Sequence, residues 1–251
     1  MVIPFFRNRP GTKMKTTTRI LSLGALAALL AACGGGGDDG PAQPPATIPL
    51  AAAMASQISL AKSGSVTITG SLSAPGQQTA NVTGTGTYTE STTAGSFEGI
   101  TGLRKHLTLT GSVTVSGQSA PLSSSSDAFY DSSNKPLGAT ASGSYCVTTA
   151  YTPLAASAQA GSSGNWYSQD CYSSSAKLAK AATSTVTYAV EADSANSLLL
   201  KLTTRVTDTA GNSLPATTTY RVTSAGAATR LTDVSTVSVN GASLNLTVTY
   251  Q

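Results

Sequence analysis

The sequence predicts an all-β fold. From about residue 60 onward, apolar and hydroxylated side chains alternate with a period of two, as at Val66, Ile68 and Leu72 with serine and threonine between them. This alternation gives each strand one apolar and one polar face, which is typical of antiparallel sheets with one face in water. The pair Asn240-Gly241 separates two such runs and favours a tight hairpin. We expect an antiparallel meander that forms an open or closed β-barrel-like sheet. A two-sheet β-sandwich is the alternative.

The C-terminal third predicts five consecutive strands that pair as neighbours, because short turns join them. Their expected ranges are 184–192, 196–207, 216–224, 228–239 and 242–250. The segment 62–147 also predicts strands, with more glycine. Helical patterns are limited to two short segments, 51–61 and 174–182.

The N-terminal region has the parts of an export signal. An apolar run covers 20–32 and is too short to span a bilayer as a helix, which takes about 20 residues. The run ends in small residues, and this order predicts a secretory signal peptide over 1–32. Met14 is a second candidate start beside Met1. Five basic residues precede the apolar run: Arg7, Arg9, Lys13, Lys15 and Arg19.

The segment Leu30-Ala31-Ala32-Cys33 resembles the lipobox of Gram-negative bacterial lipoproteins. The resemblance implies that the Cys33 thiol receives a diacylglyceryl group, that fatty acids such as palmitate anchor the chain, and that Cys33 becomes the N-terminus. Gly34 rather than aspartate follows, which implies sorting to the outer membrane; the sequence leaves the face of that membrane open. The alternative is a buried cysteine at a helix end, which four glycines from Gly34 onward disfavour.

Residues 33–50 are rich in glycine and proline, and this composition predicts a flexible tether. Residues 51–251 then form a single all-β domain in the expected organisation. The full sequence has 15 basic and 11 acidic residues, but five of the basic ones precede Cys33, so the remainder is nearly neutral. Nucleic-acid binding needs a basic surface, so we expect no nucleic-acid partner.

Cys146 and Cys171 are the two cysteines after Cys33. In an oxidising compartment such a pair usually forms a disulfide, here closing a loop near 25 residues and contributing roughly 3 kcal/mol. A free pair or a metal site is the alternative. The single histidine, His106, and the lack of a Cys-x-x-Cys pattern disfavour zinc, and no motif indicates a cofactor.

The segment 145–182 gathers much of the aromatic content, which suggests a candidate surface for stacking a sugar or an apolar ligand. Packing at one end of the sheet is the alternative, and we favour it because buried aromatic rings ordinarily serve packing. The candidate ligand-binding residues are Tyr145, Tyr151, Trp166, Tyr167 and Tyr172.

No catalytic residues are predicted. A catalytic histidine needs an orienting acid and a nucleophile, and nothing in the pattern around His106 supplies them. We therefore expect a lipid-anchored, non-catalytic protein of the cell envelope that binds a lipid, a glycan or a protein partner, or has a structural role. The alternative is a hydrolase without a recognisable motif.

Overall fold

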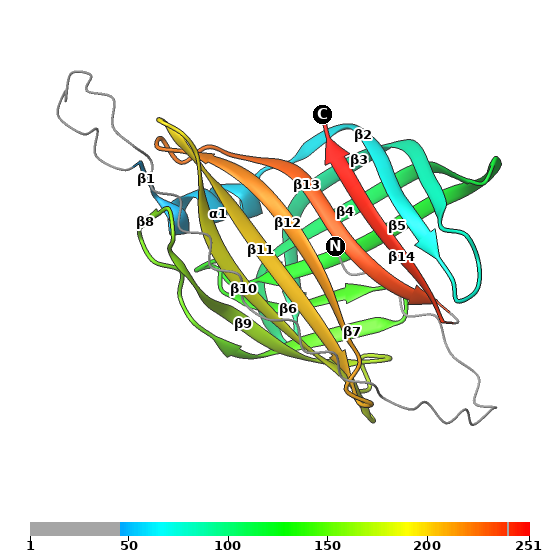
Figure 1. Cartoon of the computed structure of the whole chain (residues 1–251). Coiled ribbons are helices and arrows are strands. Elements are labelled where there is room, and N and C mark those ends of the chain that lie inside the picture. The colour runs from blue at the N-terminus through cyan, green and yellow to red at the C-terminus, as the bar shows by residue number, and fades with distance from the viewer. Residues whose placement is uncertain (1–45, 240) are drawn as a thin grey trace, which may run out of the picture. The chain divides into compact units, whose positions relative to one another are not determined.

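The computed structural model describes residues 46–239 and 241–251. These residues form a closed barrel of twelve antiparallel strands (Figure 1). The prediction of an all-β barrel is confirmed, and the sandwich alternative is wrong because the strands form one continuous ladder. The barrel strands are β2 (Lys62–Ser73), β3 (Ala80–Phe97), β4 (Ile100–Val115), β5 (Gln118–Tyr130), β6 (Pro136–Ala141), β7 (Ser144–Tyr151), β9 (Ser163–Tyr172), β10 (Lys180–Ser194), β11 (Ser197–Asp208), β12 (Ser213–Thr223), β13 (Ala228–Val239) and β14 (Ala242–Tyr250).

The barrel is an antiparallel meander that is completed by two further ladders, one between β14 and β2 and one between β7 and β9. Most neighbouring strands are consecutive in sequence, as short turns dictate. The ladder between β14 and β2 joins the two ends of the barrel sequence, with Tyr250 opposite Val66. The ladder between β7 and β9 passes over β8 (Ala158–Gln159), which pairs instead with β1 (Thr47–Ile48) in a separate two-stranded sheet.

The five strands predicted for the C-terminal third are present as β10 to β14, with longer ranges for the first and third. The helix predicted over 174–182 is wrong. Lys180 and Ala182 already pair with β9, opposite Tyr172 and Cys171, so ladder hydrogen bonds override the local alanine content. The helix predicted over 51–61 is confirmed as α1 (Leu50–Ser59).

The two faces of the barrel differ in chemistry as the alternation predicts. Side chains such as Val66, Ile68 and Val248 point inward and are at most 3 % exposed. Their neighbours along the strands are mostly threonine and serine, as at Thr67 and Thr69 on β2, and cover the outer face. An apolar interior and a hydroxylated exterior are the reverse of the lipid-facing apolar band of outer-membrane barrels.

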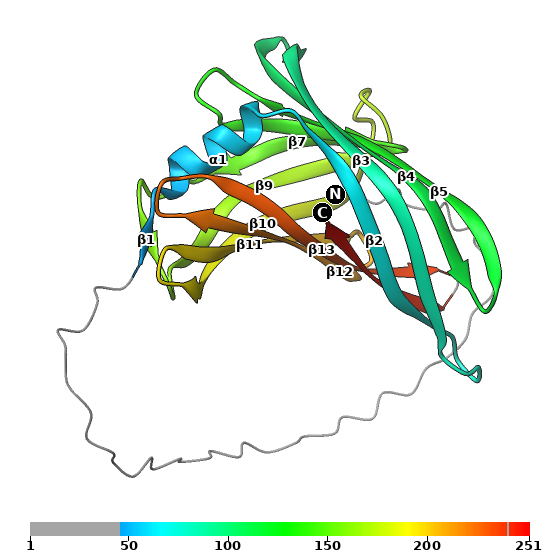
Figure 2. The same cartoon turned by 90° about the horizontal axis from the view of Figure 1, so that it is seen from above.

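The interior has three apolar clusters, and the smallest of them surrounds Cys146 and Cys171. Another lies among β2, β3, β4 and β14, where Tyr88 and Tyr250 meet edge to face with ring centroids 4.8 Å apart. The third, called here the α1 cluster, joins the helix to β9–β13, and Leu50, Leu200 and Val222 in it are fully buried. Figures 1 and 2 show α1 at the end of the barrel where β1 and β8 also lie.

Helix α1 forms because its alanine-rich sequence favours helix and its buried side packs into the barrel. Its terminal carbonyl groups are capped by the barrel wall: the Thr92 hydroxyl donates to the Ile58 oxygen at 2.7 Å. Ile48, just before the helix, is 1 % exposed. The packed part of the chain therefore begins at or before residue 46, ahead of the end at residue 50 predicted for the tether.

Candidate functional site

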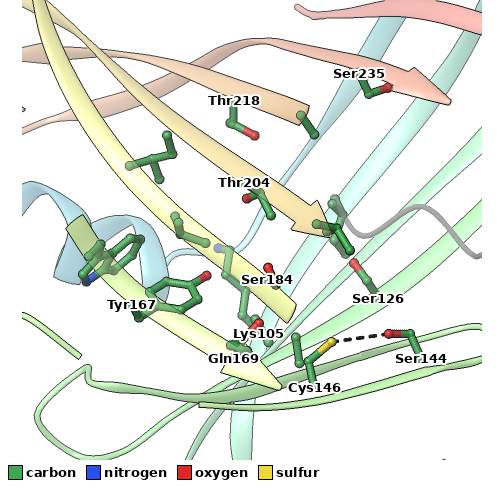
Figure 3. A pocket seen from close by; sticks show the side chains of 18 of the residues that line it. Lys105, Ser126, Ser144, Cys146, Tyr167, Gln169, Ser184, Thr204, Thr218 and Ser235 are labelled. Carbon is green, nitrogen blue, oxygen red and sulfur yellow. Dashed lines mark hydrogen bonds between the residues drawn. The ribbon is translucent and has the colours of Figure 1, made fainter. Parts of the chain in front are cut away.

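The barrel encloses a cavity between α1 and the opposite rim. Its volume is about 260 Å³, close to the lower limit of about 300 Å³ for small-molecule pockets. Apolar side chains line it toward the rim, among them Val206, Leu214 and Val237, next to the β11–β12 and β13–β14 turns. Six strands each place a hydroxyl in its wall (Figure 3): Ser126, Ser144, Ser184, Thr204, Thr218 and Ser235.

Several of these hydroxyls have no protein partner. Within the described residues, the side chains of Ser184, Thr204 and Ser235 make no hydrogen bond, although every side-chain oxygen or nitrogen sealed from solvent has one. Ser184 and Ser235 are at most 5 % exposed, so their hydroxyls reach only the cavity. The cavity therefore offers donors and acceptors that a ligand or water can use.

The wall nearest α1 carries buried charges. Arg230 donates from Nη1 to Glu90 Oε1 at 2.7 Å, and from Nε and Nη2 to the two oxygens of Asp233 at 3.2 and 2.7 Å. The Tyr250 hydroxyl donates to Asp233 Oδ2 at 2.6 Å, and the Arg230 guanidinium lies 4.6 Å from the Tyr250 ring centre. A register shift between β12 and β13 lets Arg230 and Asp233, three residues apart, face inward together.

Lys105 connects this charged wall to the helix. Its Nζ lies 3.0 Å from Glu90 Oε2 and donates to the main-chain oxygens of Gln57 and Leu60 at 2.7 and 3.0 Å. Those oxygens belong to the C-terminal end of α1, where a cation is favourable. Gln57 also donates to Glu90, at 3.3 Å, so the helix end and the charged wall form one network.

The buried carboxylates of this network are paired with cations. Burial alone would raise the pKa of Asp233, but the Arg230 charge and the Tyr250 hydrogen bond outweigh it, so the pKa is lowered. Burial opposes the charge of Arg230 as well, yet its tyrosine and carboxylate neighbours raise its pKa well above the ordinary value. Glu90 and Asp233 are thus paired with Arg230 and Lys105. Lys62, opposite Glu90 in the ladder between β2 and β3, adds a third cation, and its Nζ donates to Gln57 Oε1 at 3.1 Å and to the Ala228 oxygen at 2.7 Å.

The charged wall is not among the sites predicted from the sequence. Lys105 shares its strand parity with Leu107, and Glu90 shares parity with Tyr88, so both charges stand on the apolar face of their strands. That parity is a signal which could have found them. Arg230 gives no such signal, because the register shift on β13 breaks the alternation.

Strand β9 supplies the aromatic part of the cavity wall. Trp166 is 4 % exposed, and its ring centre lies 5.0 Å from that of Tyr167 at an angle of 70°. A register shift between β9 and β10 allows these consecutive residues both to line the cavity. Burial raises the pKa of Tyr167 to about 12, so its phenol is protonated at neutral pH. Figure 3 shows Tyr167 and Lys105 pointing into the same space as Ser184.

The other three aromatic candidates lie elsewhere. Tyr145 stands on the outer face, stacked on Phe97 at 5.0 Å, and its hydroxyl donates to Glu98 at 2.6 Å. Tyr172 is its ladder partner and points to the same outer side. Tyr151 is partly buried against the α1 cluster. The five residues therefore do not form one surface: Trp166 and Tyr167 belong to the cavity.

The predicted disulfide between Cys146 and Cys171 is present. The two residues are directly opposite each other on β7 and β9, with Cα atoms 4.0 Å apart. Both line the cavity, and Ser144 Oγ lies 3.4 Å from Cys146 Sγ. The disulfide therefore fixes the wall of the cavity at a place where its side chains are small.

Part of β5 extends beyond its ladder with β6, beside the cavity wall. The ladder between β5 and β6 ends at Ser126 and Ala141, so residues 118–125 of β5 have no neighbour on that side within the described chain. A second pocket lies there, and it shares Ser126 and Asp127 with the cavity. This pocket and the far rim are the candidate access routes for a ligand.

His106 lies on the outer face of β4. Its Nδ1 is 2.6 Å from Asp127 Oδ1, and Arg104 donates to both oxygens of the same carboxylate at 2.8 and 2.9 Å. Burial opposes ionisation of Asp127, but the hydrogen bonds from Arg104 and His106 outweigh it and lower its pKa. The arrangement is an ion-pair cluster on a paired strand, where ladder bonds occupy the main-chain N–H groups that an oxyanion hole would need.

The predicted lipidation site, Cys33, lies outside the described residues. Among those described, no group of three or more His, Cys, Asp or Glu side chains is placed to hold a metal ion. None of their helices is long and apolar enough to cross a membrane. Comparisons with protein-family models, with curated proteins and with solved structures found no match for this chain.

Proposed function

We propose that the protein is a lipoprotein of the outer membrane that binds a small molecule inside its barrel without transforming it. The anchor rests on the resemblance of Leu30–Cys33 to a lipobox. The binding function rests on one observation: a cavity of about 260 Å³ whose wall presents accessible hydroxyls that make no hydrogen bond to the described protein groups. Such hydroxyls can donate to and accept from a ligand in the cavity without giving up a bond within the protein.

Metabolic labelling with palmitate tests the anchor. We expect label in the wild-type chain, and neither label nor membrane retention in Cys33→Ser. The chain has three cysteines, so the double variant Cys146→Ser, Cys171→Ser is the matched control and should keep its label. Equal labelling of the Cys33→Ser variant would contradict the anchor.

Native mass spectrometry tests the binding function. The full chain carrying Cys33→Ser, exported and purified without detergent, should retain a small molecule that denaturation releases. Ser184→Leu fills the cavity and should abolish retention, whereas Thr185→Leu points to the outer face of the same strand and should leave it unchanged. Equal retention in both leucine variants would place the bound molecule outside the barrel.

A further inference from the structure

We infer that the cavity takes an uncharged, polyhydroxylated molecule of about the size of a monosaccharide. The inference rests on the binding function proposed above and narrows its ligand to one chemical class. The cavity volume, its unpaired hydroxyls, its ion pairs and its aromatic wall each contribute to the inference.

The volume limits the ligand to a small molecule. A volume of about 260 Å³ lies near the lower limit of about 300 Å³ for pockets that hold small molecules. A monosaccharide, with about a dozen non-hydrogen atoms, is a small molecule of the kind that such a pocket holds. A two-chain membrane lipid is several times larger and does not fit whole.

The unpaired hydroxyls favour a ligand that both donates and accepts hydrogen bonds. Ser184, Thr204 and Ser235 come from three strands and surround one space, and the Tyr167 phenol also makes no hydrogen bond within the described residues. Each of these groups can donate one hydrogen bond and accept others, as a sugar hydroxyl does. An alkyl chain in the same space would bury them without partners.

The ion pairs of the charged wall disfavour an ionised ligand. Glu90 is held by Arg230 at 2.7 Å and by Lys105 at 3.0 Å, and Asp233 takes the remaining Arg230 nitrogens. An incoming carboxylate would compete for Arg230 or Lys105 and leave a buried carboxylate of the protein with fewer partners. A neutral ligand leaves every ion pair intact, and breaking a buried pair is strongly unfavourable.

Tyr167 supplies the apolar part of the expected contact. Figure 3 shows its ring in the cavity wall close to Gln169 and Ser184. A sugar ring has an apolar C–H face as well as its hydroxyls, so it can pack on an aromatic ring while its edge bonds to serine and threonine. Trp166, edge-on to Tyr167 at 5.0 Å, holds that ring in place.

Matched pairs of probes test the ligand class. Trp166 is the only tryptophan of the chain, so its fluorescence reports occupancy in the full chain carrying Cys33→Ser. We expect one of glucose, galactose or mannose to bind, and the corresponding sugar acid, such as glucuronate for glucose, to bind at least about tenfold more weakly. Octanol and octanoate should bind more weakly than that hexose.

The outcomes separate the inference from the proposed function. Tighter binding of octanol, octanoate or a sugar acid than of every hexose would overturn the ligand class and leave a binding function standing. Absence of binding by all of these probes in both fluorescence and equilibrium dialysis, together with no molecule retained in native mass spectrometry, would overturn both.

Isosteric variants test the role of the hydroxyls. Ser184→Ala and Thr204→Val each remove one hydrogen-bonding group from the cavity, and each should weaken hexose binding by about five- to tenfold. Thr185→Val removes an outward hydroxyl from β10 and should leave hexose affinity unchanged. Unchanged affinity in both cavity variants would contradict hydrogen bonding by the wall.

Discussion

The same strands build both ends of the barrel interior, but polar groups have protein partners at one end and lack them at the other. Near α1, the buried charges of Glu90, Arg230 and Asp233 all have partners, and the apolar side chains close around the helix. In the hollow part, small residues such as Ser184 and Thr204 leave space and unpaired hydroxyls. From this contrast we expect stability to depend mainly on the filled end, while the hollow end is free to serve binding.

The largest expected effect is at the filled end. Arg230→Met removes the cation shared by Glu90 and Asp233 and leaves two buried carboxylates short of partners. We expect a loss of about 3–5 kcal/mol in the free energy of unfolding, measured in urea. Arg205→Met, on the exposed outer face of β11, is the matched control and should change it by less than about 0.5 kcal/mol. Similar small effects of both substitutions would remove the distinction between the two ends.

The next largest effect belongs to the wall of the hollow end. Replacing Cys146 and Cys171 together with serine opens a disulfide whose ends are 25 residues apart. We expect the free energy of unfolding to fall by roughly 3 kcal/mol in the chain-entropy model. Reductant should destabilise the wild-type chain and leave the double variant unaffected. A reductant effect of equal size on the double variant would mean that the disulfide is not its cause.

Acid should weaken the filled end through Asp233. The folded-state pKa of Asp233 lies below its unfolded value of about 3.9. Its contribution to stability is therefore complete above that pH and is lost as the pH falls through the lower folded value. The free energy of unfolding in urea, measured from about pH 6 downward, should fall less steeply in Asp233→Asn than in the wild-type chain. Equal slopes for the two proteins would show that carboxylates other than Asp233 cause the acid sensitivity.

The smallest expected effect on stability is at the hollow end, at Thr204. Thr204→Val removes a hydroxyl that makes no hydrogen bond within the described residues, so it should change the free energy of unfolding by less than about 0.5 kcal/mol. Thermal melting of this variant beside Arg230→Met gives the contrast directly. A loss of several kcal/mol for Thr204→Val would show that the hollow end also supports the fold.

Much of the fold could be predicted from the sequence because strand alternation is a local signal. Val66, Ile68 and Leu72 alternate with hydroxylated residues, and this pattern alone assigns one face to the interior. The closure of the barrel could not be predicted, since pairing of β14 with β2 depends on contacts between distant parts of the chain. The helix expected over 174–182 does not form for the same reason, because pairing with β9 outweighs local composition.

The site could be predicted only in part. Trp166 and Tyr167 stood out as aromatic residues, but their separation from Tyr145 depends on register shifts that no local pattern reveals. The disulfide followed from cysteine count and an expected oxidising compartment. Arg230 could not be recognised from the sequence, because a bulge changes the side of β13 that it faces. Sequence periodicity predicts regular strands, whereas Trp166 and Arg230 lie beside register shifts.

The ladder between β14 and β2 has a consequence for biogenesis. A growing or truncated chain that lacks β14 leaves β2 and β13 with bare edges, which are adhesive toward other strands. Both edges are therefore covered only once β14 has paired with β2, and the long sequence separation makes that step slow. Loss of this one strand would expose two adhesive edges at once.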